Sequence, residues 1–171
     1  WEICRELESL RAENVEIHYL RGNGYIHSSS PVSLAQDLAF ARCFTSYAFT
    51  THADLFPKRR DFLQWMLTQC GESDPMIGWE MSSRRGSDGW KGCVSHTATI
   101  WHMPTVRRIG LRWSFESWYE QIGHEPHHAD GWPDTEQPPQ YWYTLAGIKP
   151  KIFGPEYNAT DINAAQETDW W

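Results

Sequence analysis

A chain of 171 residues has the size of one domain and can bury a hydrophobic core. Its net charge of −7 argues against nucleic acid or an anionic membrane as the main partner, because both need a basic surface. No apolar run approaches the roughly 20 residues of a membrane span, and the N-terminus lacks a signal-peptide pattern, so we expect a soluble, cytoplasmic protein.

The first part of the chain predicts three helices and one strand. Apolar residues recur at helical spacing over 2–14, and serines followed by a proline predict a helix over 32–40. Alternating aromatic residues predict a strand over 42–50. Pro57 suits the start of a third helix, over 58–69.

The second part predicts antiparallel strands. A hairpin joins strands over 77–83 and 90–103, and a long twisted strand is expected over 106–122. A polar loop insertion over 124–140 precedes a final strand over 141–148. We therefore predict a single α+β domain with its helices on one side of a curved sheet.

The segment 92–103 is rich in β-branched and aromatic residues, and its alternation places His96 and His102 on one face. Two imidazoles on an otherwise apolar face indicate rings that point into a cavity, although each could equally be an ordinary core or surface histidine. Eleven tryptophans favour an aromatic-walled pocket for a small molecule. The four cysteines form no CxxC pair, which favours reduced thiols.

Several segments resemble the scytalone dehydratase family of the NTF2-like superfamily. They are Tyr141-Trp-Tyr-Thr-Leu-Ala-Gly-Ile-Lys-Pro150, Ser117-Trp-Tyr-Glu-Gln-Ile122, the His-x5-His of His96 and His102, the Tyr-x-Phe of Tyr47 to Phe49, and Asp61-Phe62. The resemblance implies a cone-shaped fold, a curved, mostly antiparallel sheet around helices, with a C-terminal lid over 155–167. It also implies an enzyme without cofactor or metal that removes water from a polyketide-derived ring in fungal secondary metabolism.

The resemblance also implies roles for particular residues. It makes His102 a catalytic histidine, and Tyr47 and Tyr25 the tyrosines that hold a water against the substrate carbonyl. We further predict that five residues of the pocket contact the substrate: His96, Trp113, Phe115, Ser117 and Tyr157. A buried imidazole near neutral pKa can take a C–H proton and pass it to a departing hydroxyl.

Four positions depart from the family pattern. Pro75 stands where the family has its second histidine, and Ile26 stands where it has an aspartate. Trp113 and Phe115 replace the serine and asparagine that bind substrate hydroxyls. A pocket with these rings favours a more apolar substrate than scytalone, and we expect a polyketide- or terpenoid-derived small molecule.

Three classes of function follow. The first is a dehydratase or isomerase that uses His102, and the second is a cyclase or pericyclase that holds an apolar substrate in a reactive conformer. The third is a non-catalytic NTF2-like binding module. The cluster His124-Glu-Pro-His127-His128-Ala-Asp130 has metal-ligand types, but its flanking prolines favour an exposed loop.

Self-association is also expected. Trp101 with Thr97 and Thr99 lies on the strand face opposite the histidines, which is too apolar to remain in water. We predict a trimer, as the family resemblance implies, or a dimer.

Overall fold

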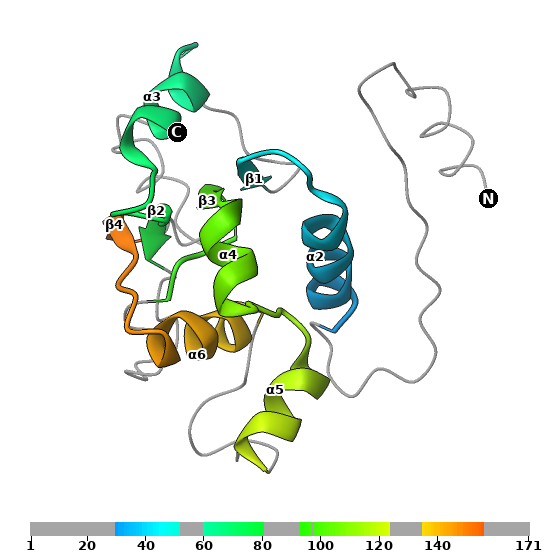
Figure 1. Ribbon diagram of the computed structural model, residues 1–171. Coiled ribbons are helices and arrows are strands. Elements are labelled where there is room, and N and C mark those ends of the chain that lie inside the picture. The colour runs from blue at the N-terminus through cyan, green and yellow to red at the C-terminus, as the bar shows by residue number, and fades with distance from the viewer. Residues whose placement is uncertain (1–29, 52–59, 81–92, 97, 124–134, 156–171) are drawn as a thin grey trace, which may run out of the picture.

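The computed structural model describes residues 30–51, 60–80, 93–96, 98–123 and 135–155 (Figure 1). In these ranges the chain forms five helices and four strands, which confirms the predicted α+β class. In chain order they are α2 (Ser30–Arg42), β1 (Tyr47–Thr51), α3 (Phe62–Gln69), β2 (Met76–Glu80), β3 (Ala98–His102), α4 (Met103–Ile109), α5 (Phe115–Ile122), α6 (Gln137–Leu145) and β4 (Lys151–Pro155).

The four strands form one mixed sheet in the order β1-β3-β2-β4. β3 pairs antiparallel with β1, where Tyr47 lies opposite His102, and antiparallel with β2, where Met76 lies opposite Trp101. β2 pairs in parallel with β4, a strand that the sequence pattern did not predict. β1 and β4 are therefore the edges of the described sheet.

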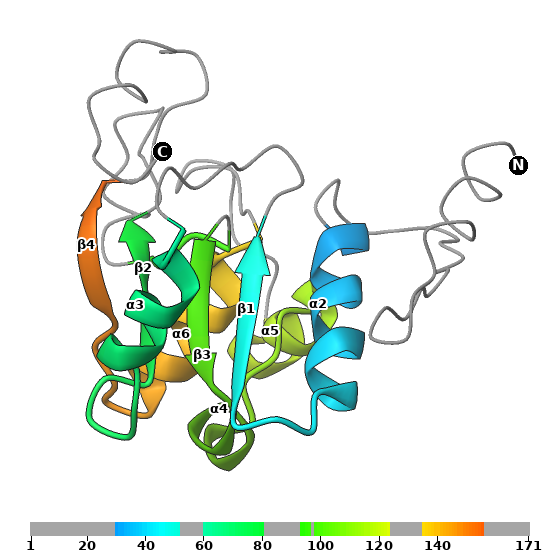
Figure 2. The same cartoon turned by 90° about the horizontal axis from the view of Figure 1, so that it is seen from above.

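The sheet is covered by helices on both faces (Figure 2). One core joins α2, α4 and α6 to the sheet through Phe40, Met76, Trp101, Met103, Val106, Leu111, Trp113 and Tyr143. A second core joins α3 to the opposite face through Phe62, Met66, Cys70, Ile77, Trp79, Ala98 and Ile100. The expectation of helices on one side only is wrong, because β2 and β3 carry apolar side chains on both faces and each face must be buried.

The strand face that was expected to remain exposed is buried within the chain. Trp101 and Thr99 are both 0% exposed, and the Trp101 ring packs edge-on against Phe40 and Trp113 at centroid distances of 5.6 and 5.2 Å. Its indole Nε1 donates to the hydroxyl of Thr50 at 2.9 Å. The basis for predicting self-association is therefore wrong, since α2, α4 and α6 already cover this face.

The elements predicted over 32–69 agree with the structure to within a few residues. The helix predicted over 32–40 is α2, with Pro31 in its first turn, and the helix predicted over 58–69 ends at Gln69 as α3. β1 begins at Tyr47 rather than at residue 42. The preceding stretch meets α4 instead of another strand, because the Arg107 guanidinium donates to the carbonyls of Cys43 and Thr45.

The long strand predicted over 106–122 is wrong, because two helices stand there. Pro104 lies in the first turn of α4, where its missing N–H has no cost, and Gly110 ends that helix with φ of 65°. Ser114 caps α5 by accepting the N–H of Ser117 at 3.2 Å, and Gly123 closes it with φ of 80°. Leu111, Trp113 and Phe115 are buried in these segments.

Two further strand predictions need correction. The strand predicted over 90–103 is reduced to Ala98–His102 in the described residues, and residue 96 lies in a turn. In place of the final strand predicted over 141–148, residues 141–145 belong to helix α6 and the chain turns directly after it. The helix also includes residues 137–140, the end of the supposed loop over 124–140. Pro138 and Pro139 lie in the first turn of α6, where they are compatible with a helix.

Asp37 connects α2 to the start of α5. Its two carboxylate oxygens accept the backbone N–H groups of Trp113 and Ser114 at 2.8 and 3.0 Å. Burial raises the pKa of Asp37 above its ordinary value, and these two hydrogen bonds and the charge of Arg112 offset only part of this increase. The carboxylate thus positions the turn that leads into α5.

Some predictions concern residues outside the described part of the chain. They include the helix over 2–14, Tyr25, the His124–Asp130 cluster, Tyr157 and the lid over 155–167 beyond its first residue. Within the described part, Cys43, Cys70 and Cys93 are thiols and form no disulfide, as predicted.

Candidate functional site

A turn before β3 and the start of α6 bring His96 to Glu136. The turn is held to β2 by the backbone hydrogen bond from Ser95 N–H to the carbonyl of Trp79 at 2.9 Å. Glu136 lies at the N-cap of α6. Its Oε1 is hydrogen-bonded to His96 Nδ1 and also accepts the His96 backbone N–H at 3.3 Å. One carboxylate oxygen therefore fixes both the ring and the backbone of His96.

The carboxylate of Glu136 is almost fully removed from water. Its side chain is 2% exposed, whereas that of His96 is 13% exposed. The second oxygen, Oε2, is buried and has no hydrogen-bond partner among the residues described. A buried carboxylate with one unsatisfied oxygen is strongly destabilising unless it is paired, so the imidazole of His96 is its main compensation.

The pairing determines which histidine nitrogen can exchange protons. A carboxylate accepts the proton of Nδ1, and the lone pair of the neutral ring is then on Nε2. The negative charge of Glu136 also stabilises the imidazolium that forms when Nε2 takes up a proton. This is the arrangement of a histidine general base with an orienting carboxylate.

One aromatic ring, that of Trp113, packs beside this pair. The His96 ring lies edge-on to the indole of Trp113, with the centroids 6.2 Å apart. Trp113 is 0% exposed and packs in turn against Phe40 and Trp101. The imidazole is therefore placed at the border of the hydrophobic core, where an electrostatic partner acts more strongly than in water.

A phenol and a thiol lie near the carboxylate. Tyr143, on α6, is 2% exposed and Cys93 is 0% exposed. Burial, with smaller contributions from Cys93 and Glu136, raises the pKa of Tyr143 well above its ordinary value, while a hydrogen bond with the Val94 backbone lowers it. The phenol is therefore neutral at physiological pH and can act only through hydrogen bonds.

The structure brings His102 and Tyr47 together on the other side of the sheet. They are paired between β3 and β1, and their ring centroids are 5.5 Å apart. His102 Nδ1 is hydrogen-bonded to the hydroxyl of Thr105 at 3.0 Å, which fixes the orientation of the imidazole. Tyr47 packs against the core that α3 covers.

The two histidines lie against different hydrophobic cores, whereas strand alternation predicted that they share one face. His96 contacts Trp113 in the core under α2, α4 and α6, while the partner of His102 lies in the core under α3. Alternation fails because the chain turns at residue 96, so the count of two residues per repeat does not extend back from β3.

The predicted substrate-contact residues are divided. Trp113 does lie beside His96. Phe115 is 0% exposed and packs against Trp118 and Tyr119, which makes it a core residue of α5. Ser117 belongs to the cap of α5, since its hydroxyl accepts from Ser114 at 2.7 Å. Tyr25 and Tyr157 lie outside the described residues.

Sequence reasoning missed Glu136 and Tyr143. Glu136 fell in the predicted loop over 124–140, and Tyr143 fell in the predicted strand over 141–148. No pattern therefore linked them to His96, which lies 40 positions before Glu136. The signal that could have found them is the pair Pro138-Pro139, because prolines in a first helical turn place Glu136 and Tyr143, seven residues apart, on one side of a helix.

No family model, curated protein or solved structure matches this chain. Among the described residues, no three His, Cys, Asp or Glu side chains are grouped so that they could hold a metal ion. A search of the same residues finds no helix with the length and apolar character needed to cross a membrane.

Proposed function

We propose that this protein is an enzyme of the dehydratase or isomerase type, in which His96 transfers a proton on a small, largely apolar molecule. Glu136 orients His96 and stabilises its protonated form. The observation that carries the proposal is the hydrogen bond between His96 Nδ1 and a carboxylate that is 2% exposed. Such a base and orienter pair is typical of sites that perform general acid–base catalysis.

The proposed dehydration needs only proton transfers. His96 Nε2 takes the proton from a carbon next to a carbonyl, and the electrons of that C–H bond form a C=C bond as the C–O bond of a β-hydroxyl breaks. The imidazolium returns the same proton to the departing hydroxyl, which leaves as water. In an isomerisation, the proton returns to a different carbon instead.

The surroundings favour a substrate with a substantial apolar part. The indole of Trp113 packs beside His96, and a net charge of −7 disfavours anionic substrates. The resemblance to scytalone dehydratase directs this proposal to polyketide- or terpenoid-derived molecules of fungal secondary metabolism. A β-hydroxy tetralone is a suitable test compound, because loss of water gives a naphthol that is followed by absorbance.

The test compares variants of the pair on this compound. His96→Ala is expected to lower turnover about 10²- to 10⁴-fold, since positioned proton transfer contributes that much. His96→Gln cannot titrate and is expected to be nearly as damaging. Glu136→Gln keeps the shape but removes the charge, so it should lower turnover and shift the pH–rate profile. Unchanged turnover in both His96 variants would remove this proposal.

A second candidate places the same reaction at His102 and Tyr47, as the family resemblance implies. The ring contact at 5.5 Å and the hydrogen bond from Thr105 favour it. This candidate requires the cone-shaped NTF2-like fold, with Tyr25 and the lid over 155–167 completing the site. His102→Ala and His102→Gln separate the two candidates, because each predicts that the other histidine can be replaced with little loss of turnover.

A further inference from the structure

Tyr143 is a second residue of α6 that reaches the chain segment carrying His96. This segment comprises residues 93–96, and its first three residues are buried. The Tyr143 side chain is buried as well, and its phenol forms a hydrogen bond with the backbone of Val94. Burial raises the pKa of Tyr143 and this hydrogen bond opposes the increase, so the backbone N–H is the donor and the phenol oxygen is the acceptor.

Helix α6 therefore holds the segment 93–96 at two points. Oε1 of Glu136 accepts the backbone N–H of His96 at 3.3 Å and is hydrogen-bonded to its ring, whereas Tyr143 accepts the N–H of Val94. Seven residues, about two helical turns, separate Glu136 from Tyr143, so both side chains project from the same side of α6. Two separate contacts prevent the rotation that a single hydrogen bond would permit.

On its other side, the segment 93–96 packs directly against β2. Ser95 N–H donates to the carbonyl of Trp79 at 2.9 Å. A Cβ atom added to Gly78 would lie 2.9 Å from a methyl carbon of Val94, closer than side chains normally approach. The segment thus has no room to move toward β2, and the contacts with α6 fix it from the opposite direction.

The phenol of Tyr143 is itself held in place. Its ring belongs to the same hydrophobic core as Trp113, the indole that packs beside the His96 imidazole. Ile148 N–H donates to the carbonyl of Tyr143 at 2.8 Å, which closes the end of α6. A tyrosine side chain has only two rotatable bonds, so a buried phenol is a rigid spacer. The hydrogen bond to Val94 therefore links the segment to a fixed point in the core.

We propose that Tyr143 is a positioning residue for His96, whose phenol oxygen holds the Val94 N–H so that the imidazole keeps its hydrogen bond to Glu136. The inference rests on the proposed function of His96 as the base. Tyr143 neither touches the substrate nor transfers a proton in this role. Because a displacement of about 1 Å can lower a rate about 10²-fold, loss of this contact should affect turnover more than substrate binding.

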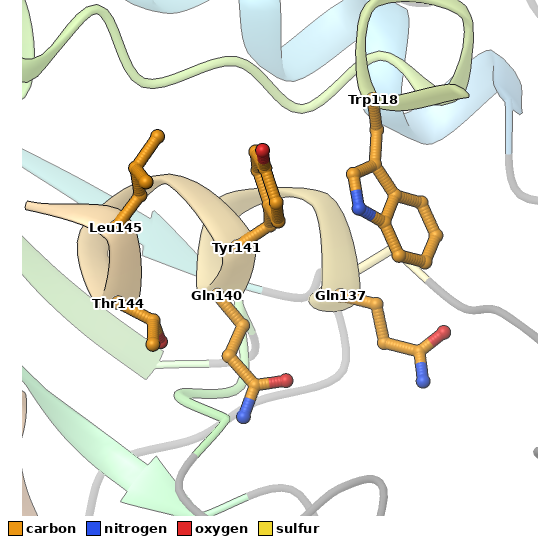
Figure 3. A pocket seen from close by; sticks show the side chains of 6 residues that line it. All are labelled: Trp118, Gln137, Gln140, Tyr141, Thr144 and Leu145. Carbon is orange, nitrogen blue, oxygen red and sulfur yellow. The ribbon is translucent and has the colours of Figure 1, made fainter. Parts of the chain in front are cut away.

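The first experiment compares two tyrosine variants on the β-hydroxy tetralone. Tyr143→Phe removes only the phenol oxygen, so kcat is expected to fall about tenfold while KM stays within about twofold of the parent value. The matched control is Tyr141→Phe, which removes a hydroxyl from the other side of α6, where Figure 3 shows the ring in the hollow that Trp118 of α5 also lines. The control should keep the parent's kcat and KM. A parent-like kcat in Tyr143→Phe would overturn the proposal.

The second experiment reads the His96 ring without turnover. In ¹⁵N-histidine-labelled protein, the His96 signals are those that disappear in His96→Gln. The parent should show the Nδ1–H tautomer, because the carboxylate of Glu136 accepts that hydrogen. Tyr143→Phe should increase the share of the Nε2–H tautomer, and Tyr141→Phe should leave it unchanged.

An unchanged tautomer ratio in Tyr143→Phe would overturn the positioning role, whatever the turnover. His96→Ala tests the proposed function separately, so a failure of the proposed function is distinguished from a failure of this inference.

Thermal unfolding establishes that each variant is folded at the assay temperature. If Tyr143→Phe does not fold, Tyr143 is replaced by a tyrosine that carries fluorine next to the hydroxyl, which keeps the phenol but makes its oxygen a weaker acceptor. The kcat should then fall about twofold to threefold, with a smaller shift toward the Nε2–H tautomer. A parent-like kcat and a parent-like tautomer ratio in this protein would overturn the proposal.

Discussion

Cys70 follows the last residue of α3, where its thiol lies 4.0 Å from the carbonyl of Ile100 in β3. It is 7% exposed. Burial, with a smaller contribution from the negative charge of Asp74, raises the pKa of this thiol from 9.0 to about 12, although a hydrogen bond with the Gly71 backbone lowers it. The folded protein therefore keeps Cys70 protonated at pH values where the unfolded chain releases the proton.

This difference predicts a loss of stability in alkali. Because the folded pKa is the higher one, the contribution of Cys70 is fully present below pH 9 and is lost as the pH rises through about 12. Between pH 9 and about pH 11, the free energy of unfolding should fall by up to about 1.4 kcal/mol per pH unit more in the parent chain than in Cys70→Ala.

Urea denaturation at several pH values measures this slope. Cys43→Ala, which replaces a half-buried thiol at the end of α2, serves as the control and should keep the parent's alkaline slope. Parallel curves for the parent and Cys70→Ala over this range would contradict the prediction.

At the scale of elements, the start of α5 depends on a residue of α2. The turn at Trp113 and Ser114 presents two backbone N–H groups that no residue of α5 itself can accept, and the carboxylate of Asp37 takes both. The hydroxyl of Ser114, the N-cap residue, then accepts the N–H of Ser117 in the first turn of the helix. A local cap and a long-range cap together determine where α5 begins.

We predict that Asp37→Ala lowers the free energy of unfolding by about 1 to 3 kcal/mol, because two buried N–H groups lose their acceptor. Asp37→Asn should lower the free energy of unfolding by a similar amount. Its amide nitrogen would replace one carboxylate oxygen and would face a backbone N–H donor instead of accepting from it. Chemical denaturation checks both values. Val32→Ala, at a 41% exposed position of α2, is the control, and a loss as large as that of Asp37→Ala would contradict the specific role of the carboxylate.

At the scale of the whole molecule, the sheet is an inner layer between two sets of helices. Its central strands are apolar on both faces, and the described helices pack against both of them. Trp101 lies in the middle of this arrangement and joins α2, the sheet and the segment before α5 through the rings of Phe40 and Trp113.

We therefore predict that Trp101→Ala lowers the free energy of unfolding by about 3 to 5 kcal/mol, the usual loss for a large buried aromatic side chain. Phe44→Ala, at a 92% exposed position, should lose less than about 0.5 kcal/mol. Thermal and urea unfolding, with light scattering on the same samples, measure both effects. A Trp101 variant that keeps its stability but changes its oligomeric state would restore the interface interpretation.

Local signals in the sequence were sufficient for part of this structure. Serine and proline at the start of α2, the apolar spacing of α3 and the β-branched residues of β3 predicted these elements, because each signal acts over one or two turns or residue pairs. Local signals were misleading over 106–122 and 141–148, where the alternation of apolar residues predicted strands. Over 106–122, Gly110, Ser114 and Gly123 are the signals of helix ends that mark the two helices observed.

The candidate site was only partly predictable. His96 was a candidate substrate contact because of its type and its apolar neighbours, and Tyr47 and His102, which the family resemblance put in one site, do lie close together. Glu136 could not be found, because its contact with His96 depends on how α6 crosses the sheet. No local pattern contains that information.

The sequence by itself determined the α+β class and the positions of α2, α3 and β3, since these depend on neighbouring residues and on solvent alone. Only the tertiary structure decided which faces of the sheet are covered and which histidine meets a carboxylate. Those outcomes arise from the packing of α6 and α3 on opposite faces of the sheet, which joins side chains far apart in the chain.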